Sequence, residues 1–334
     1  MNLFDEWSQT GLPEVGFFST DKTYCKFSLL DKTRPVVISF AMMGSYVRGD
    51  EKDVDSSVWS FDYILQKNLN CISFCCIDDA SWYRDVDLIK WLNLIASAIR
   101  YFPERLGYGG SMGGYGVLAY SDILKMDRVL VMNPITTLSE ELAPFEKRFT
   151  KAKKYLDWLG EFKDGAASTA QGYIVFDPLF EPDSLHARRL NLKKLRFSGV
   201  GHFMPVHLQK LGILNWLFDS FVSGRVDEKK FYRDIRKRRN YLRYYDWLLS
   251  DENKYLTPKR AGVIRMYKDF FLVKTGEKEI VAKKSIDKLR DFALEIENIS
   301  VPKALQAMEI AKEMRPGGKV ITRKIKFYKE RLSL

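Results

Sequence analysis

The sequence predicts an α/β protein, with a mostly parallel sheet covered by helices on both faces, followed by an all-helical C-terminal domain. Short apolar runs alternate with helical stretches over the first two thirds of the chain, and the strand signals stop near residue 223. Runs such as VVISFA and RVLVM are apolar throughout, which is typical of strands buried on both faces. A chain of 334 residues that is 46% hydrophobic and 29% charged is long enough to bury such a core.

The apolar runs and the helical periodicity define the elements in order. Strands are predicted at residues 26–30, 35–41, 70–77, 105–109, 128–132, 172–177 and 195–200. Helices are predicted between them at residues 58–67, 87–101, 113–126, 183–190 and 204–220. Helices rich in Lys, Arg, Tyr and Leu follow, and the segment ALQAMEIAKEMRPGGKVITRKIKFYKERL loosely resembles a tetratricopeptide hairpin, without a second copy at a fixed period.

The net charge of +11 is distributed unevenly. Residues 225–334 hold 29 basic and 16 acidic residues, whereas the preceding part holds 25 basic and 27 acidic ones. We therefore predict an α/β domain at residues 1–222 and a basic helical domain at residues 223–334. The run RDIRKRRNYLRYY suits an acidic protein or a polyanion, and it also suits a solvated helix face. No RNA-binding signature accompanies it, which disfavours nucleic acid as the partner.

Composition also bears on compartment and cofactors. Three of the four cysteines are crowded into NCISFCCI, without the spacing of a zinc site, so we expect buried reduced thiols and no metal or other cofactor. The N-terminus lacks the basic and apolar regions of a secretory signal, and no run of eighteen apolar residues occurs. These features predict a cytoplasmic protein without a membrane span.

Residues 107–116 read GYGGSMGGYG and carry the main chemical motif. Gly109, Ser111 and Gly113 match G-x-S-x-G between a predicted strand and a predicted helix, which is the setting of a nucleophile elbow. The turn is too tight for side chains two residues before and two residues after the serine. Ser111 is thus the predicted nucleophile; the alternative is a glycine-rich turn that only packs a helix close to the sheet.

A serine hydroxyl needs a base, and the chain has three histidines. His202 follows the last predicted strand, where a loop can reach back over the sheet, so it is the predicted base. His186 and His207 fall within predicted helices, where packing explains them. The acid is expected between the serine and the histidine in chain order. Asp177, directly after the strand YIVF, is preferred, and Asp183, an apparent helix N-cap, is the alternative.

Further residues are expected around this site. The backbone N–H groups of Met112 and Met42 are the predicted oxyanion donors, because one follows the nucleophile and the other follows the strand VVISFA. Trp82, Tyr83 and Arg84 should lie at the same edge of the sheet. There they could line the substrate pocket, by stacking on a sugar or binding an anion; alternatively, Trp82 packs against the sheet.

Together, the elbow, the loop at residues 41–44 and the pair Asp177 and His202 make residues 1–222 resemble the α/β-hydrolase superfamily. The segments DDASWYR, GGSMGGYG and VMNPITTLSEELAPFEKRF also look like a group of bacterial hydrolase-like proteins of unassigned substrate. The turn after YIVF departs from the pattern, since it lacks a glycine-containing spacer before the acid. The assignment of Asp177 as the acid therefore stays open.

The resemblance implies a serine hydrolase that cleaves an ester or thioester through a Ser-His-Asp triad and an acyl-enzyme intermediate, with a small molecule or a glycan as the acyl substrate. The first alternative is an acyltransferase on a sugar or glycan hydroxyl. The second is a non-catalytic scaffold that binds an acidic partner through the C-terminal helices.

Overall fold

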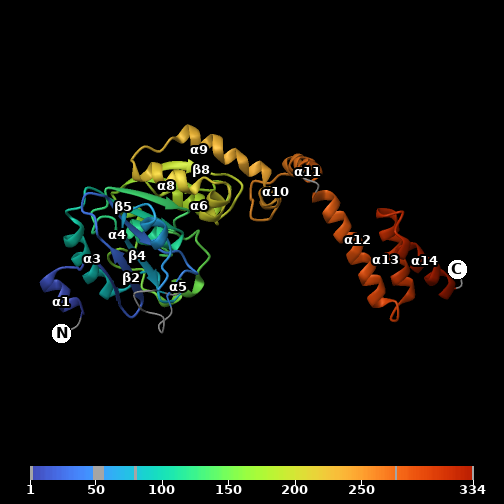
Figure 1. Ribbon diagram of the computed structural model, residues 1–334, viewed down its shortest axis with the longest axis horizontal. Helices are drawn as coiled ribbons and strands as arrows, with labels where there is room; N and C mark the ends of the chain where they lie inside the picture. Colours follow the sequence, from blue (N-terminus) through green and yellow to red (C-terminus); the bar gives the residue numbers. More distant parts are fainter. Residues whose placement is uncertain (1–2, 48–55, 79–80, 275–276, 333–334) are drawn as a thin grey trace. The chain divides into compact units, whose positions relative to one another are not determined.

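The computed structural model describes residues 3–47, 56–78, 81–274 and 277–332. It divides into two compact units, Met1–Leu256 and Thr257–Leu334 (Figure 1). The first unit continues past residue 222, where the sequence placed a domain boundary. The helices between residue 223 and Leu256 therefore pack with the sheet, despite the basic composition that they share with the second unit.

One eight-stranded sheet forms the centre of the first unit, in the order β1-β2-β4-β3-β5-β6-β7-β8. Strand β2 pairs antiparallel with β1 and with β4. Every later pair of neighbours in this order, from β4 with β3 to β7 with β8, is parallel. Each of the seven predicted strands overlaps an observed strand, although β8 shares only residues 195 and 196 with the predicted 195–200, and β1 is an additional edge strand. The strands are β1 Val15–Ser19, β2 Thr23–Ser28, β3 Val36–Phe40, β4 Asn70–Cys76, β5 Arg105–Gly110, β6 Arg128–Met132, β7 Gln171–Phe176 and β8 Lys193–Arg196.

Helices cover both faces of this sheet (Figure 1). They are α1 Leu3–Thr10, α2 Phe61–Leu65, α3 Val86–Ile99, α4 Met112–Tyr120, α5 Thr150–Tyr155, α6 Glu181–Arg188, α7 Met204–Lys210, α8 Leu214–Val222, α9 Glu228–Asp234 and α10 Leu242–Leu248, with short 3₁₀ helices η1 Gly165–Ala167 and η2 Ile235–Asn240. The predicted helix at 204–220 is two helices, because Gly212 at φ +67° interrupts it. The predicted fold class is confirmed.

The side chains of β3 show how the sheet separates two cores. Ile38 and Phe40 pack into a core with α3 and α4, whereas Val37 packs on the opposite face into a core with α2, α7 and α8. This alternation follows from the two-residue period of a strand. Because both faces are covered, substrate access is left to the loops at the strand ends.

The parallel strands end at one edge, and their loops meet there. The loop after β8 is packed against α10: a Cβ atom at Gly199 would collide with the ring of Tyr244, and one at Gly201 would collide with the indole of Trp247. Both glycines have positive φ, at +86° and +70°. Helix α10, from the basic part of the sequence, thus supports the loop that carries His202.

The second unit consists of α11 Pro258–Lys274, α12 Glu277–Ile296, α13 Val301–Met314 and α14 Lys319–Arg331. Small residues of α13, such as Ala304 and Ala311, share a core with Ile325 and Tyr328 of α14. The predicted hairpin is therefore a packed helix pair, and its likeness to a tetratricopeptide motif stays a prediction. Binding of an acidic partner by residues 225–334 also stays a prediction. Among the helices that the structure describes, none has the length and apolar character needed to cross a bilayer.

Candidate active site

Ser111 lies on a sharp bend between β5 and α4, with φ +52° and ψ −118°. A Cβ atom at Gly109 would lie 2.6 Å from the carbonyl oxygen of Gly113, and one at Gly113 would collide with the carbonyl of Phe40. Both motif glycines are thus required by close backbone contacts, as the sequence predicts. A strand, a strained serine and a helix in this order on a mostly parallel sheet give the first unit an α/β-hydrolase-like fold.

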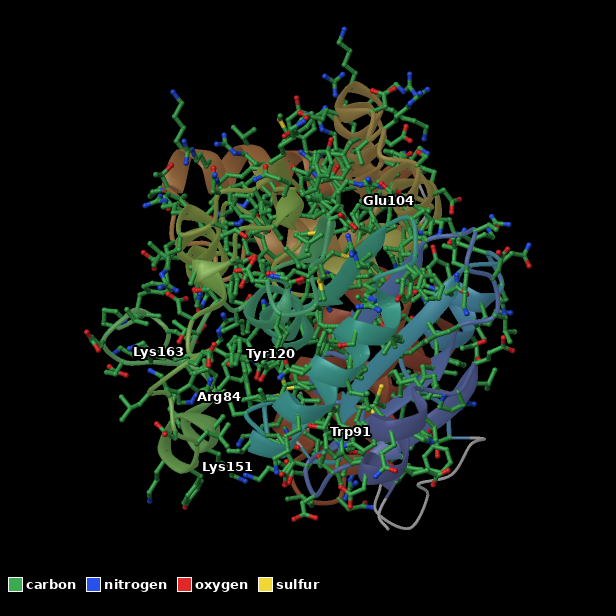
Figure 2. All side chains as sticks on the ribbon, turned by 90° about the vertical axis from the view of Figure 1, so that its left-hand side faces the viewer. Arg84, Trp91, Glu104, Tyr120, Lys151 and Lys163 are labelled. Atoms are coloured by element: carbon green, nitrogen blue, oxygen red, sulfur yellow. The ribbon has the colours of Figure 1, made fainter. Side chains whose placement is uncertain are left out.

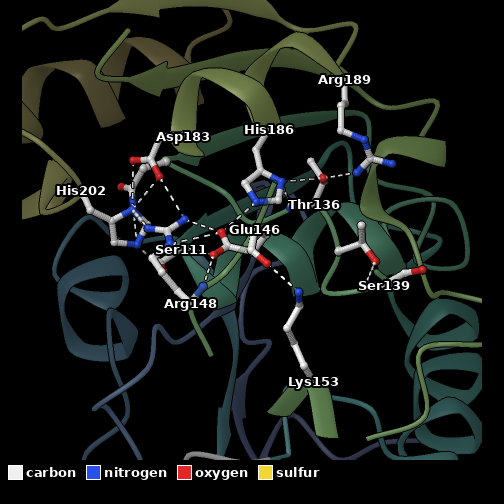
Figure 3. A network of polar contacts seen from close by, with 12 residues as sticks. Ser111, Thr136, Ser139, Glu146, Arg148, Lys153, Asp183, His186, Arg189 and His202 are labelled. Carbon is white, nitrogen blue, oxygen red and sulfur yellow. Dashed lines mark hydrogen bonds and ion pairs between the residues drawn. The ribbon is translucent and has the colours of Figure 1, made fainter. Parts of the chain in front are cut away.

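The structure brings Ser111 and His202 together, although 91 positions separate them in the sequence. The Ser111 Oγ atom lies 2.8 Å from the His202 Nε2 atom (Figure 3). The Nδ1 atom of the same ring lies 2.8 and 2.9 Å from the two carboxylate oxygens of Asp183. Since an ionised carboxylate only accepts hydrogen bonds, we assign the proton to Nδ1, which leaves Nε2 free to accept from the serine.

The carboxylate that lies beside His202 belongs to Asp183, and this corrects the expectation that Asp177 lies there. Asp183 is 1% exposed and lies in the first turn of α6, whose N-cap is Phe180, so the expected N-cap role of Asp183 is also wrong. Asp177 directly follows β7, but its carboxylate does not reach the imidazole. The chain continues into the first turn of α6 before Asp183 brings a carboxylate to His202.

Asp177 instead holds the backbone of the loop that carries His202. Its Oδ2 atom accepts hydrogen bonds from the N–H groups of Gly199, Val200 and Gly201, at 2.9, 2.7 and 2.7 Å. Its Oδ1 atom accepts from the N–H of Leu179 at 2.8 Å. Burial raises the pKa of Asp177 to about 6, although these backbone donors act in the opposite direction. Asp177 therefore fixes the position of the loop rather than of the imidazole.

Arg148, which carries no sequence motif, also reaches the site (Figure 3). Its Nη1 atom lies 3.3 Å from the His202 Nδ1 atom, and its Nη2 atom lies 3.5 Å from the Asp183 Oδ1 atom. Its Nε and Nη2 atoms donate to the two carboxylate oxygens of Glu146, at 2.9 and 2.6 Å. Sequence reasoning gave Arg148 and Glu146 no role, because their segment precedes α5 and lies outside every predicted element. The one signal was the resemblance of VMNPITTLSEELAPFEKRF, which contains both residues, to bacterial hydrolase-like proteins.

Glu146 continues this network into the interior. The N–H of Thr136 donates to the Nδ1 atom of His186 at 3.2 Å, so the His186 proton is on Nε2, which donates to Glu146 at 3.1 Å. Burial lowers the pKa of His186. Burial acts to raise the pKa of Glu146, but hydrogen bonds from His186 and Arg148 outweigh it and lower that pKa to about 2. Near neutral pH, Glu146 is therefore ionised and His186 is neutral.

Asn133 is another side chain at the imidazole that the sequence did not reveal. It follows β6 directly, has φ +40°, and places its Nδ2 atom 3.2 Å from each nitrogen of the His202 ring. The strained backbone aims this amide at the ring, so Asn133 restricts how the imidazole can tilt.

The two predicted oxyanion donors are Met112, within the elbow, and Met42, near Gly110. Met112 is the first residue of α4, and N–H groups of a first helical turn have no acceptor within their helix. Met42 follows β3, and its methyl group lies 3.4 Å from the position of a Cβ atom on Gly110. This placement is compatible with the expected role, which stays a prediction.

A cavity of about 730 Å³ adjoins the elbow at Gly110. Met42 and Pro205 line it, and each would be 3.4 Å from a Cβ atom on Gly110. Its wall includes Trp59, which stacks on Tyr108 with ring centroids 5.2 Å apart and planes 12° apart. The cavity therefore has an aromatic wall and lies beside Gly110, but neither Ser111 nor His202 is among its lining residues.

Trp82, Tyr83 and Arg84 do not lie at the site, which corrects their predicted place in the substrate pocket. Trp82 and Tyr83 are both 0% exposed, because consecutive positive φ angles of +48° and +57° turn their side chains into the core. The Tyr83 hydroxyl donates to the carbonyl of Ala41 at 2.7 Å. None of the three residues lines the cavity beside the elbow.

Arg84 has a structural role at the surface of the first unit (Figure 2). Its guanidinium donates to the carbonyl oxygens of Asp157, Leu159 and Glu161, at 3.1, 2.9 and 3.1 Å. These bonds fix the loop after α5. The anion-binding role that the sequence suggested for Arg84 is therefore replaced by backbone binding.

The cysteines are buried and unbridged. Burial raises the pKa values of Cys71, Cys75 and Cys76 to about 12, so these thiols are poor nucleophiles and poor metal ligands near neutral pH. Among the residues that the structure describes, no group of three His, Cys, Asp or Glu side chains could hold a metal ion.

No protein-family model and no curated protein sequence matches this chain. Among solved structures, a capsule O-acetyltransferase of Neisseria meningitidis serogroup A is 13% identical, with a TM-score of 0.43, over 64% of this chain and 95% of that one. Acetyl xylan esterase 1 from a Thermoanaerobacterium species is 13% identical, with a TM-score of 0.37, over 66% of this chain and 92% of that one.

A thermophilic esterase from Thermogutta terrifontis is 12% identical, with a TM-score of 0.43, over 63% of this chain and 92% of that one. Because these identities are low and the TM-scores are below 0.5, an activity is inferred only from the residues of the site.

Proposed function

We propose that the protein is a serine hydrolase that cleaves an ester or a thioester through an acyl-enzyme intermediate. One observation carries this proposal: Ser111 Oγ, on a strained elbow, lies 2.8 Å from His202 Nε2, and His202 Nδ1 lies 2.8 Å from the buried Asp183. Nucleophile, base and orienting acid within hydrogen-bond distance of one another are the arrangement that serine acyl transfer requires.

In the proposed reaction, the Ser111 hydroxyl attacks the acyl carbonyl while His202 Nε2 accepts its proton. The resulting tetrahedral intermediate expels the alcohol or thiol, which takes that proton from the imidazolium. A water molecule then attacks the acyl-enzyme with His202 again as the base, and the acid is released with the serine restored. Asp183 keeps the imidazole in the tautomer that has Nε2 unprotonated and stabilises the imidazolium.

The backbone N–H groups of Met112 and Met42 are the proposed donors to the oxyanion. Their value lies in being fixed before the charge develops, since fixed donors need no reorganisation during the reaction. The methionine side chains have no part in this role.

The class of reaction is tested with the full chain and p-nitrophenyl acetate, a small activated ester. We expect turnover above the uncatalysed rate, and loss of turnover in proportion to the fraction of protein modified by a fluorophosphonate, which reacts with activated serines. Absence of turnover, together with absence of modification, would contradict the proposal.

The choice of acid is tested by two matched substitutions, Asp183→Asn and Asp177→Asn. We expect Asp183→Asn to lower kcat for p-nitrophenyl acetate by about 10³- to 10⁴-fold, because an amide cannot hold the required tautomer. Asp177→Asn should lower kcat less than about tenfold and destabilise the fold by about 1–3 kcal/mol, because it weakens buried backbone hydrogen bonds. Rates and urea unfolding of both variants check this, and the reverse ranking of kcat would restore Asp177 as the acid.

Acyl transfer to a hydroxyl group is a second candidate, favoured by the cavity beside Gly110. An acceptor alcohol could bind against the aromatic wall that includes Trp59, in the cavity beside Gly110, and take the place of water as the acyl acceptor. Methyl glucoside added to the p-nitrophenyl acetate reaction distinguishes the two: a hydrolase releases acetate and nitrophenolate equally, whereas a transferase releases less acetate and forms acetylated glucoside.

A further inference from the structure

We infer that Arg148 and Glu146 form a positioning pair whose charges set the pH range over which His202 can act as the base. The inference rests on the proposed function and adds to it two residues outside the triad. It starts from the contact between the Arg148 guanidinium and the imidazole, whose nitrogens Nη1 and Nδ1 are 3.3 Å apart.

Two buried carboxylates compete for the Arg148 guanidinium. It forms two hydrogen bonds with Glu146, at 2.9 and 2.6 Å, whereas its distance to Asp183 is 3.5 Å. Glu146 is 0% exposed, and Asp183 is 1% exposed. A guanidinium held by a bidentate pair has a fixed orientation, so Glu146 determines where the positive charge of Arg148 lies relative to His202.

The charge balance of this cluster changes when the imidazole accepts a proton. With His202 and His186 neutral, Arg148 offsets Glu146, and the charge of Asp183 remains. Once His202 takes the serine proton, the imidazolium offsets Asp183, and the remaining negative charge lies on the oxyanion formed at the acyl carbon. Pairing of the imidazolium with the buried Asp183 carboxylate stabilises the state formed during attack.

The charges around His202 act on the imidazolium in opposite directions. A positive charge 3.3 Å from the ring opposes the imidazolium, whereas Asp183 and, at a greater distance, Glu146 favour it. Removal of the Arg148 charge should therefore favour the imidazolium, and removal of the Glu146 charge should disfavour it. The two substitutions are expected to act in opposite directions.

Other groups near His202 leave this difference unchanged between the variants. The ring also meets Ser111 and the uncharged amide of Asn133. Further charged groups on the packed elements include Asp177 under the loop and Arg243 of α10, which lies over the Phe203 ring at 5.9 Å. Asp177, whose pKa is about 6, titrates within the tested range, but it does so in the wild type and in every variant alike.

The test measures the second-order rate of modification by a fluorophosphonate, from about pH 5 to about pH 8, in the full chain. In this reaction the Ser111 oxygen bonds to phosphorus, the fluoride leaves, and His202 takes the hydroxyl proton. Each profile falls at low pH as the imidazole becomes protonated. We expect Arg148→Met to move this acid limb upward by about 1 pH unit, and Glu146→Gln to move it downward.

Two further variants guard against effects of misfolding. Arg148→Met alone leaves Glu146 buried without its cation, which is destabilising, whereas the double variant Glu146→Gln with Arg148→Met leaves neither charge. The double variant should move the acid limb upward by less than Arg148→Met alone, because loss of the more distant Glu146 charge offsets part of the effect of losing the nearer Arg148 charge. Arg148→Lys should keep the limb in place, since it keeps the charge.

Lys153→Met is the matched control. Lys153 donates to the backbone carbonyl of Glu146 at 2.5 Å and to the side chain of Glu140 at 2.6 Å, without a contact to the imidazole. Its removal should leave the limb unchanged. Displacement of the limb in the same direction by Arg148→Met and Glu146→Gln, or no displacement in either, would overturn the inference. If Ser111→Ala is modified as fast as the wild type, the proposed function fails instead.

Discussion

Ser111→Ala should lower kcat for p-nitrophenyl acetate by about 10⁵- to 10⁶-fold, to the residual rate that binding and the oxyanion donors provide. The expected size follows from the loss of the covalent step, since no other described hydroxyl occupies the elbow. The measurement is a steady-state assay of purified variant, with the amount of protein raised to compensate for the low rate.

The fold of this variant provides the control. Replacing a serine by alanine on the bend keeps the backbone and removes one oxygen, so the urea midpoint should stay close to that of the wild type. A variant that unfolds normally and keeps more than about a tenth of the wild-type kcat would show that the hydroxyl of Ser111 is not the nucleophile.

His202→Ala should have an effect of similar size, because serine and histidine act as one unit in proton transfer. We expect the loss in kcat from the double variant with Ser111→Ala to be about the same as from either single variant. The comparison of the three rate losses measures this coupling directly, since independent residues would give multiplied losses.

His207→Gln is the matched control for this substitution. His207 is buried, on α7, and contacts Tyr241 at 3.4 Å. Burial lowers its pKa to about 4, so the side chain is neutral near pH 7 and the amide replaces it without loss of charge. Activity within a few-fold of the wild type is expected. Equal losses from His202→Ala and His207→Gln would indicate a general loss of structure rather than loss of the base.

The elbow and its histidine could be predicted from the sequence because each depends on local signals. The glycine spacing around Ser111 reports a bend whose contacts are made within a few residues and with the neighbouring strand β3. His202 directly follows a strand, and the shared edge of parallel strands determines where such a loop lies. The strand positions followed from apolar runs for the same reason.

The acid could not be chosen from the sequence, because two aspartates follow the same strand. Asp177 is closer to the strand end, but three N–H groups from the loop after β8 enclose it, and such groups have no sequence signature. Asp183 reaches His202 only because α6 begins at Glu181 and directs its first turn toward the loop.

Arg148, Trp82 and Tyr83 show two other limits of sequence reading. The role of Arg148 depends on long-range contacts of a segment without periodicity. The sequence indicated that Trp82 and Tyr83 follow a strand end. It could not indicate that two successive positive φ angles direct their side chains into the core and not into the substrate pocket. Composition likewise suggested a boundary near residue 223, whereas the packing of Trp247 against Gly201 joins that part to the first unit.

The most direct test of the central claim is to locate the adduct that a fluorophosphonate forms on the full-length protein. Mass spectrometry of the digested protein should find one modified residue, Ser111, at a stoichiometry near one per chain, and no modification after His202→Ala over the same interval. An adduct on a different residue, or undiminished modification of Ser111 in the absence of the imidazole, would contradict the claim that His202 activates this serine.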